Sequence, residues 1–185
     1  RTSALLHTDN ELILIDCGPD FREQMLRLDT FHKLDAVLLT HEHYDHVGGI
    51  DDLRPYSFVK TLPVYAEKFV IEHLLQRIPY CFGNNKYPGT PQLELKEIEA
   101  GKSFSVGSFD ILPIRVMHGK LPILGYRIGN MAFITDMKSI DDTQVALLKG
   151  LDLLIVNALH TKEHPTHQNL MQAINFAERV GAKET

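Results

Sequence analysis

One short segment of the sequence carries three imidazoles and one carboxylate: His41, His43, Asp45 and His46. Neutral imidazole and carboxylate are the usual ligands, apart from thiolate, for zinc and for iron or manganese. An apolar stretch precedes the segment and the pair Gly48-Gly49 follows one residue after His46, which is the context that such a motif needs. The spacing therefore predicts a metal-binding segment in preference to a solvated, histidine-rich loop.

Side chains this close together in the chain cannot all point at one ion. His41 and His43 are two residues apart and share a side, whereas Asp45 and His46 lie further round the turn. The segment thus predicts one pair of ligands for each of two metals. Each metal then needs further ligands from elsewhere in the chain.

The elements around the segment indicate where the further ligands lie. Residues 34–39 form an apolar run that predicts a buried strand, and in open α/β sheets ligands bind at the C-terminal ends of strands. His118 follows a predicted strand at 111–117, and Asp136 follows another at 132–135. We expect both to be metal ligands. The alternatives are a strand-end histidine without a role for His118 and a helix N-cap for Asp136.

Strands and helices alternate along most of the sequence. Apolar runs predict strands at 12–15, 34–40, 62–65, 93–98, 109–117, 123–128, 131–135 and 153–156. Helices are predicted at 19–28, 66–77 and 141–149, and a last helix is expected to begin with Thr166 as its N-cap and to end near Val180. Two sheets with helices outside them would accommodate this order.

Composition narrows the function further. The chain has 185 residues, 44% of them hydrophobic, which predicts a single globular domain. The net charge is −5 and no basic block is present, so we expect no long nucleic acid as a partner, although a small phosphate substrate is compatible. Cys17 and Cys81 show no C-x-x-C spacing, which favours a reduced, cytoplasmic setting. No run approaches the roughly 20 apolar residues of a membrane span, so no membrane partner is expected.

These residues resemble the metallo-β-lactamase superfamily, whose signature matches His41-x-His43-x-Asp45-His46 with a later lone His118 and Asp136. Longer phrases at 16–20, 49–55, 117–122, 125–127 and 134–137 resemble the branch that contains phosphoribosyl cyclic phosphate phosphodiesterase and is related to RNase Z. The resemblance implies an α/β (α+β) protein, a four-layer αββα sandwich. It also implies one domain over 1–185 that is incomplete at both ends.

The resemblance assigns the ligands to two divalent ions, with Zn favoured and Mn or Fe as alternatives. It implies His41, His43, His118 and Asp136 for the first metal, and Asp45, His46 and a bridging Asp136 for the second. The family adds one more histidine from a Leu-Thr-His phrase after the last helix, and this sequence stops at Thr185, where that phrase should begin.

The implied activity is hydrolysis of a small, cyclic phosphodiester by a metal-bound hydroxide. Asp45 and His167 are the expected catalytic residues. His167 matches in position the histidine of the RNase Z His-Ser-Thr phrase and would act as general acid or phosphate donor; His164 is the next candidate, and a surface histidine is the alternative. The rival functions are hydrolysis of a thioester, a lactam or an RNA 3′ end, and a non-catalytic metal-binding domain. A homodimer is left open.

Overall fold

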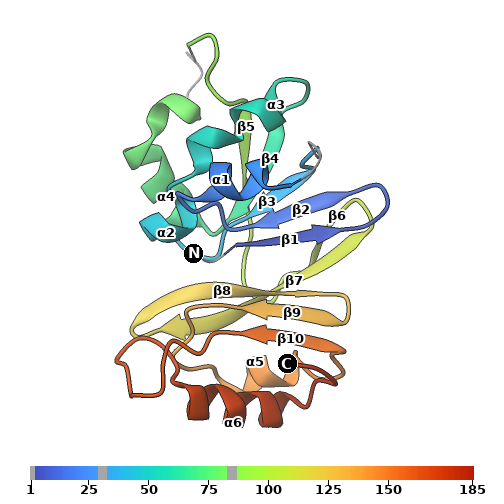
Figure 1. Cartoon of the computed structure of the whole chain (residues 1–185), viewed down its shortest axis with the longest axis vertical. Helices are drawn as coiled ribbons and strands as arrows, with labels where there is room; N and C mark the ends of the chain where they lie inside the picture. Colours follow the sequence, from blue (N-terminus) through green and yellow to red (C-terminus); the bar gives the residue numbers. More distant parts are fainter. Residues whose placement is uncertain (1–2, 29–32, 83–86) are drawn as a thin grey trace. The chain divides into compact units, whose positions relative to one another are not determined.

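The chain forms two compact units, Arg1–Glu99 and Ala100–Thr185, which we describe separately as unit 1 and unit 2 (Figure 1). The computed structural model describes residues 3–28, 33–82 and 87–185. Each unit contains one five-stranded sheet with helices packed on it, so the mixed α/β class expected from the sequence is confirmed. Within the described residues, no helix is both long enough and apolar enough to cross a membrane.

The sheet of unit 1 has the strand order β1-β2-β3-β4-β5. All neighbouring pairs are parallel except β1 and β2, which are antiparallel. Every residue of β2 and β3 is buried, which explains why these strands are continuous apolar runs in the sequence. The strands are β1 (Ala4–His7), β2 (Leu12–Ile15), β3 (Ala36–Leu38), β4 (Leu62–Ala66) and β5 (Leu93–Glu97).

Short helices connect these strands. They bury apolar side chains against the sheet in one cluster, in which Phe21, Leu53 and Leu74 of the helices meet Leu14 and Val37 of the strands. The helices are α1 (Phe21–Leu26), α2 (Tyr44–Val47), α3 (Arg54–Ser57) and α4 (Lys68–Arg77), with 3-10 turns η1 (Ile50–Leu53) and η2 (Pro79–Cys81).

The sheet of unit 2 has the order β10-β9-β8-β7-β6 and is antiparallel except between β9 and β10. Two helices lie on one side of this sheet (Figure 1). Their residues Val145 and Phe176 join Ile114, Ala132 and Leu154 of the strands in a second apolar cluster. The elements are β6 (Phe104–Val106), β7 (Phe109–His118), β8 (Leu121–Ile128), β9 (Met131–Ile134), α5 (Asp142–Ala146), β10 (Leu153–Val156) and α6 (Leu170–Val180).

The start of the last helix differs from the prediction. The N-cap is Asn169, not Thr166: the Asn169 side chain accepts the backbone N–H of Gln172, and the Gln172 side chain accepts the backbone N–H of Asn169. This reciprocal capping box satisfies the backbone N–H groups of Asn169 and Gln172 at the start of the helix. His167 therefore lies in the turn before α6. The prediction that the helix begins at Thr166 and His167 was wrong.

Two strands were missed from sequence. β1 and β6 are short strands at the sheet edges, and all of their residues except Val106 are partly buried or exposed. Neither strand is a fully buried apolar run like β2 and β3, and the pairing of each depends on a neighbouring strand.

Candidate metal ligands in each unit

Unit 1 brings its three predicted imidazoles together immediately after β3. His41 and His46 are buried, and their ring centroids lie 4.1 Å apart. The ring of His43 lies 4.5 Å from that of His41, and His41 Nε2 is 3.0 Å from His43 Nδ1. His43 is the N-cap residue of α2 and has an extended backbone. It lies in the chain between the end of β3 and the helix that carries His46. The segment thus forms one compact group of nitrogen ligands.

Asp45 lies in the first turn of α2, beside His46. One carboxylate oxygen of Asp45 is 3.5 Å from His46 Nε2, and its side chain is more than half exposed. Two ligands of a tetrahedral zinc ion are separated by roughly 3.3 Å, given metal–ligand bonds of about 2.0–2.1 Å. Both the His41–His43 pair, at 3.0 Å, and the Asp45–His46 pair, at 3.5 Å, are close to this separation. Each of these two pairs therefore has the separation that two ligands of one metal ion would need.

A buried carboxylate, that of Asp16, orients His46 through a hydrogen bond. Asp16 directly follows β2, and its side chain accepts hydrogen bonds from His46 Nδ1 at 2.7 Å and from the backbone N–H of Thr40 at 2.8 Å. Burial raises the pKa of Asp16, while the hydrogen bonds from His46 and Thr40 act in the opposite direction. A carboxylate can only accept, so Nδ1 of His46 carries the proton and Nε2 keeps its lone pair for a metal.

Thr40 extends the same arrangement to His41. Its hydroxyl donates to Asp16 at 2.8 Å and therefore accepts the Nδ1–H of His41 at 2.9 Å. His41 Nε2 is thus also left as the nitrogen with a lone pair. The sequence reasoning gave neither Asp16 nor Thr40 a role. The position of Asp16 just after an apolar strand, like that of Asp136, is the signal that could have identified it.

Backbone hydrogen bonds fix the ligand segment to the turn that follows β2. The N–H of Cys17 donates to the carbonyl of His46 at 2.7 Å, and the N–H of Gly49 donates to the carbonyl of Cys17 at 2.8 Å. A Cβ on Gly49 would lie 2.2 Å from the carbonyl oxygen of Gly18. Only glycine permits this approach of two backbones, which explains the need for glycine after the ligand segment.

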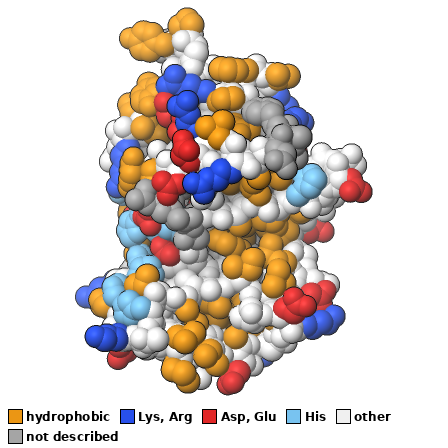
Figure 2. Space-filling view, viewed as in Figure 1, with side chains coloured by type: hydrophobic (Ala, Val, Ile, Leu, Met, Phe, Trp, Pro, Cys, Tyr) orange, Lys and Arg blue, Asp and Glu red, His pale blue; other side chains and the backbone are white. Residues whose placement is uncertain are grey.

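Unit 2 brings together three further candidates. His118 ends β7, Asp136 follows β9, and His167 lies in the turn before α6. Each offers one ligand atom, and these atoms lie within 4.8 Å of one another. Figure 2 shows histidine side chains gathered at the surface near the segment between β10 and α6. Residues from three separate elements therefore form a group that is suited to a cation.

Hydrogen bonds also orient the candidate ligands of unit 2. His118 Nδ1 donates to the backbone carbonyl of Thr166 at 2.9 Å, which leaves Nε2 with its lone pair. Thr135 donates its hydroxyl to Asp136 at 2.9 Å. Asp136 Oδ1 is 3.9 Å from His167 Nδ1. The imidazoles and carboxylates of both units thus have the chemistry and the orientation that a divalent metal requires, and zinc, manganese or iron would suit them.

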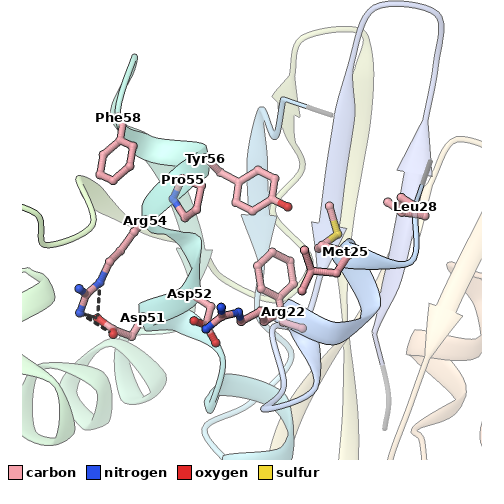
Figure 3. Close-up of a pocket in the computed structure, with 11 residues that line it drawn as sticks. Arg22, Met25, Leu28, Asp51, Asp52, Arg54, Pro55, Tyr56 and Phe58 are labelled. Carbon is pink, nitrogen blue, oxygen red and sulfur yellow. Dashed lines mark hydrogen bonds and ion pairs between the residues drawn. The ribbon is translucent and has the colours of Figure 1, made fainter. Parts of the chain in front are cut away.

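Unit 1 also contains a cavity of about 790 Å³ beside α1 and α3 (Figure 3). Phe21 and Tyr56 meet edge to face at 5.5 Å along its wall. Arg54 donates to both carboxylate oxygens of Asp51, as the dashed lines in Figure 3 mark. The described residues that line the cavity carry two arginines and two aspartates and include none of the candidate ligands. The cavity therefore has no net charge that would favour an anion.

Comparison with known proteins defines the class. The Beta-lactamase superfamily domain matches residues 11–185, so the chain belongs to this superfamily. The crystal structure of a diphosphatase from the PhnP family superposes with a TM-score of 0.90 and 37% identity, over 99% of this chain and 70% of that one. The metallo-β-lactamase fold expected from the sequence is thereby confirmed.

The chain is also similar in sequence to two curated proteins. It is 50% identical over 187 residues to an octanoyltransferase of Porphyromonas gingivalis, covering 100% of this chain and 38% of that protein. It is 29% identical over 133 residues to ribonuclease Z of a Bradyrhizobium species, covering 69% of this chain and 44% of that protein. The chain thus spans less than half the length of these two relatives. The ribonuclease Z and PhnP-family matches agree with the predicted branch.

Proposed function

We propose that this chain is a metal-dependent hydrolase of small phosphodiesters, cyclic ones in particular. The observation that carries the proposal is the set of oriented imidazoles: the Nδ1 atoms of His41, His46 and His118 all have hydrogen-bond acceptors, so each presents Nε2 as a ligand atom. A ring that donates from Nδ1 keeps a lone pair on Nε2, as a metal ligand requires, which supports the proposal.

The proposed ligands are the candidate ligands of unit 1 and unit 2. His41, His43, His118 and Asp136 would hold one divalent ion, and Asp45, His46 and Asp136 would hold the other, with zinc favoured. When bound, two such ions would lower the pKa of a bound water toward ~7 and offset negative charge on a phosphodiester. The similarity to a diphosphatase, a protein that acts on phosphate groups, supports phosphorus–oxygen chemistry over lactam or thioester cleavage.

Other residues of the chain would donate a proton to the leaving group and hold the candidate ligands in their orientation. His167 lies 3.9 Å from Asp136 and is therefore next to a proposed ligand, where it can donate a proton to a leaving alkoxide. Asp16 and Thr40 would keep His41 and His46 fixed, so that the ligands need no reorientation when metal binds.

The experiment compares four substrates on the same protein: bis-p-nitrophenyl phosphate, adenosine 2′,3′-cyclic phosphate, a thioester and a chromogenic lactam. We expect hydrolysis of the two phosphodiesters, its loss after chelation and its return with zinc or manganese. If only the thioester or only the lactam is cleaved, the proposed substrate class is wrong. Full activity in metal-depleted protein would refute the proposal.

A further inference from the structure

The backbone of the ligand segment in unit 1 accepts a hydrogen bond from a residue far away in the chain. Arg77 Nη1 donates to the carbonyl oxygen of Glu42 at 2.6 Å, across 35 positions of the sequence. Glu42 lies directly between His41 and His43. The donor is a guanidinium, and hydrogen bonds from charged donors are shorter and stronger than those between neutral groups. The proposed function gives Arg77 no role.

The helix that carries Arg77 is packed against the core of unit 1. Arg77 is the last residue of α4, whose buried residues Val70 and Leu74 join the apolar cluster that contains Val64 of β4. The N–H of Ile78 donates to the carbonyl of Leu74 at 2.9 Å, which closes the last turn of the helix. Arg77 is therefore presented to the ligand segment by a packed helix, and helices position side chains more precisely than loops do.

The bond to Arg77 restrains one peptide unit of the ligand segment. A peptide unit is planar, so a bond to its oxygen restrains the orientation of the whole plane, which here joins Glu42 to His43. The carbonyl of His43 itself accepts the N–H groups of His46 at 2.9 Å and Val47 at 3.1 Å. Both peptide units around His43 are thus restrained, and the direction in which its side chain leaves the backbone is restrained with them.

His41 is restrained in a different way. Its Nδ1 donates to the hydroxyl of Thr40, and the backbone N–H and the hydroxyl of Thr40 both donate to Asp16. His43 Nδ1 lies 3.0 Å from His41 Nε2, so the separation of these two candidate ligand atoms depends on the restraints on both residues. Thr40 and Asp16 provide the restraint on His41, and Arg77 contributes to the restraint on His43.

We infer that Arg77 is a positioning residue for metal binding. Its bond to the carbonyl of Glu42 holds His43 at the distance from His41 at which both imidazoles can bind one ion. The inference rests on the proposed function and adds to it a residue that acts through the backbone. Loss of the bond leaves His43 free to take other orientations, and these must be given up each time a metal binds.

The other candidate pair of unit 1 is held by separate contacts. His46 Nδ1 donates to Asp16 at 2.7 Å, and the carbonyl of His46 accepts the N–H of Cys17 at 2.7 Å. Neither contact involves Arg77. Loss of Arg77 should therefore weaken metal binding by the pair that includes His43 and spare the pair that includes His46.

The positive charge of Arg77 allows positioning to be distinguished from electrostatics by the sign of the effect. A guanidinium remains charged in proteins and repels a divalent cation, so on charge alone its removal would raise metal affinity. Removal of a positioning contact lowers metal affinity, because the ligand is then less well oriented before the metal binds. A fall in affinity in a variant without this charge is therefore evidence for positioning.

The test follows zinc binding to the metal-free protein and needs no substrate. The imidazole signals of His43 and His46 are recorded by NMR as zinc is added in competition with a chelator, for the wild type and for Arg77→Met. We expect the midpoint for His43 to move to about tenfold higher free zinc, as for loss of an outer-shell partner, and the midpoint for His46 to stay unchanged. Arg77→Lys, which keeps a donor on a long side chain, should retain most of the affinity.

A matched control removes an arginine from the end of another helix. Arg179 lies in the last turn of α6 and pairs with Asp142, and Arg179→Met should leave both midpoints unchanged. If Arg77→Met moves the midpoints of His43 and His46 by the same factor, Arg77 serves the stability of the unit and the positioning role is refuted. A lower midpoint for His43 would refute it as well, since the charge would then dominate.

The same titration separates this inference from the proposed function. If both rings of the wild type respond to zinc but Arg77→Met has an unchanged midpoint for His43, the role of Arg77 is wrong and the hydrolase proposal stands. If the midpoint moves as expected and none of the phosphodiesters is cleaved, Arg77 is confirmed as a positioning residue and the proposed substrate class fails. A wild type in which neither ring responds to zinc would overturn both.

Discussion

The two units assemble their candidate ligands in different ways. In unit 1 the ligands are neighbours in the chain, His41 to His46, and the segment is fixed to the turn after β2 by backbone hydrogen bonds. In unit 2 the group comes from the ends of β7 and β9 and from the turn before α6. A continuous segment can be recognised from its spacing, whereas a dispersed set depends on the folding of the whole sheet.

Two aspartates sharpen this contrast. Asp16 and Asp136 each lie just after a strand and each have a left-handed backbone, with φ of 58° and 53°. This conformation is uncommon for residues other than glycine, and aspartate tolerates it better than most. Asp16 is fully buried and engages His46 and Thr40, while Asp136 keeps 13% of its side chain exposed beside His167. The same strand-end position therefore provides a support in unit 1 and a candidate ligand in unit 2.

The largest effect is expected from removing a ligand in either unit. His41→Ala and Asp136→Ala should each lose bound metal and lower the hydrolysis rate by roughly a thousandfold or more. Metal content per chain and the initial rate on bis-p-nitrophenyl phosphate are measured together, with His73→Ala as the control. If either variant keeps full metal content and full rate, its assignment as a ligand is wrong.

The variant His167→Ala tests whether His167 is a proton donor or a third metal ligand within unit 2. We expect His167→Ala to keep its metal and to lose about 10²- to 10⁴-fold in kcat, the range for general acid–base catalysis. Metal analysis of the same sample decides the role. Loss of metal with activity would make His167 a ligand beside His118 and Asp136, and an unchanged kcat would remove it from the mechanism.

Asp16→Ala tests the support of unit 1. Loss of the carboxylate leaves His46 Nδ1 and the Thr40 N–H without their buried acceptor, at a cost of about 1–3 kcal/mol each in the free energy of unfolding. Metal affinity should fall about 10- to 100-fold. Chemical denaturation of the metal-free protein and competition with a chelator measure the two effects separately. Asp16→Asn, which keeps one acceptor oxygen, should lie between Asp16→Ala and the wild type.

The smallest effect concerns the start of α6. Asn169→Ala should lower the free energy of unfolding by about 1 kcal/mol, because it removes the side-chain cap. Thr166→Ala, at the position that the sequence suggested for the cap, should change it by less than about 0.5 kcal/mol. Thermal denaturation of both variants compares them directly, and a larger loss from Thr166→Ala would contradict the assignment of Asn169.

Strong local patterns allowed much of the fold to be predicted. The apolar runs of β2 and β3 identified these strands because burial on both faces removes polar alternation from the sequence. The edge strands β1 and β6 and the start of α6 were not predicted correctly. Edge pairing depends on a neighbouring strand, and Asn169 and Thr166 are both acceptable caps until the fold determines which backbone groups are exposed.

The sequence by itself determined the kinds of candidate ligand and kept His41, His43, Asp45 and His46 in one segment, since residues this close in the chain cannot separate. Only the tertiary structure decided that Asp16 accepts a hydrogen bond from His46 and that the carbonyl of Thr166 accepts one from His118. These contacts join residues from separate elements, and the distance along the chain carries no information about them until the strands have paired.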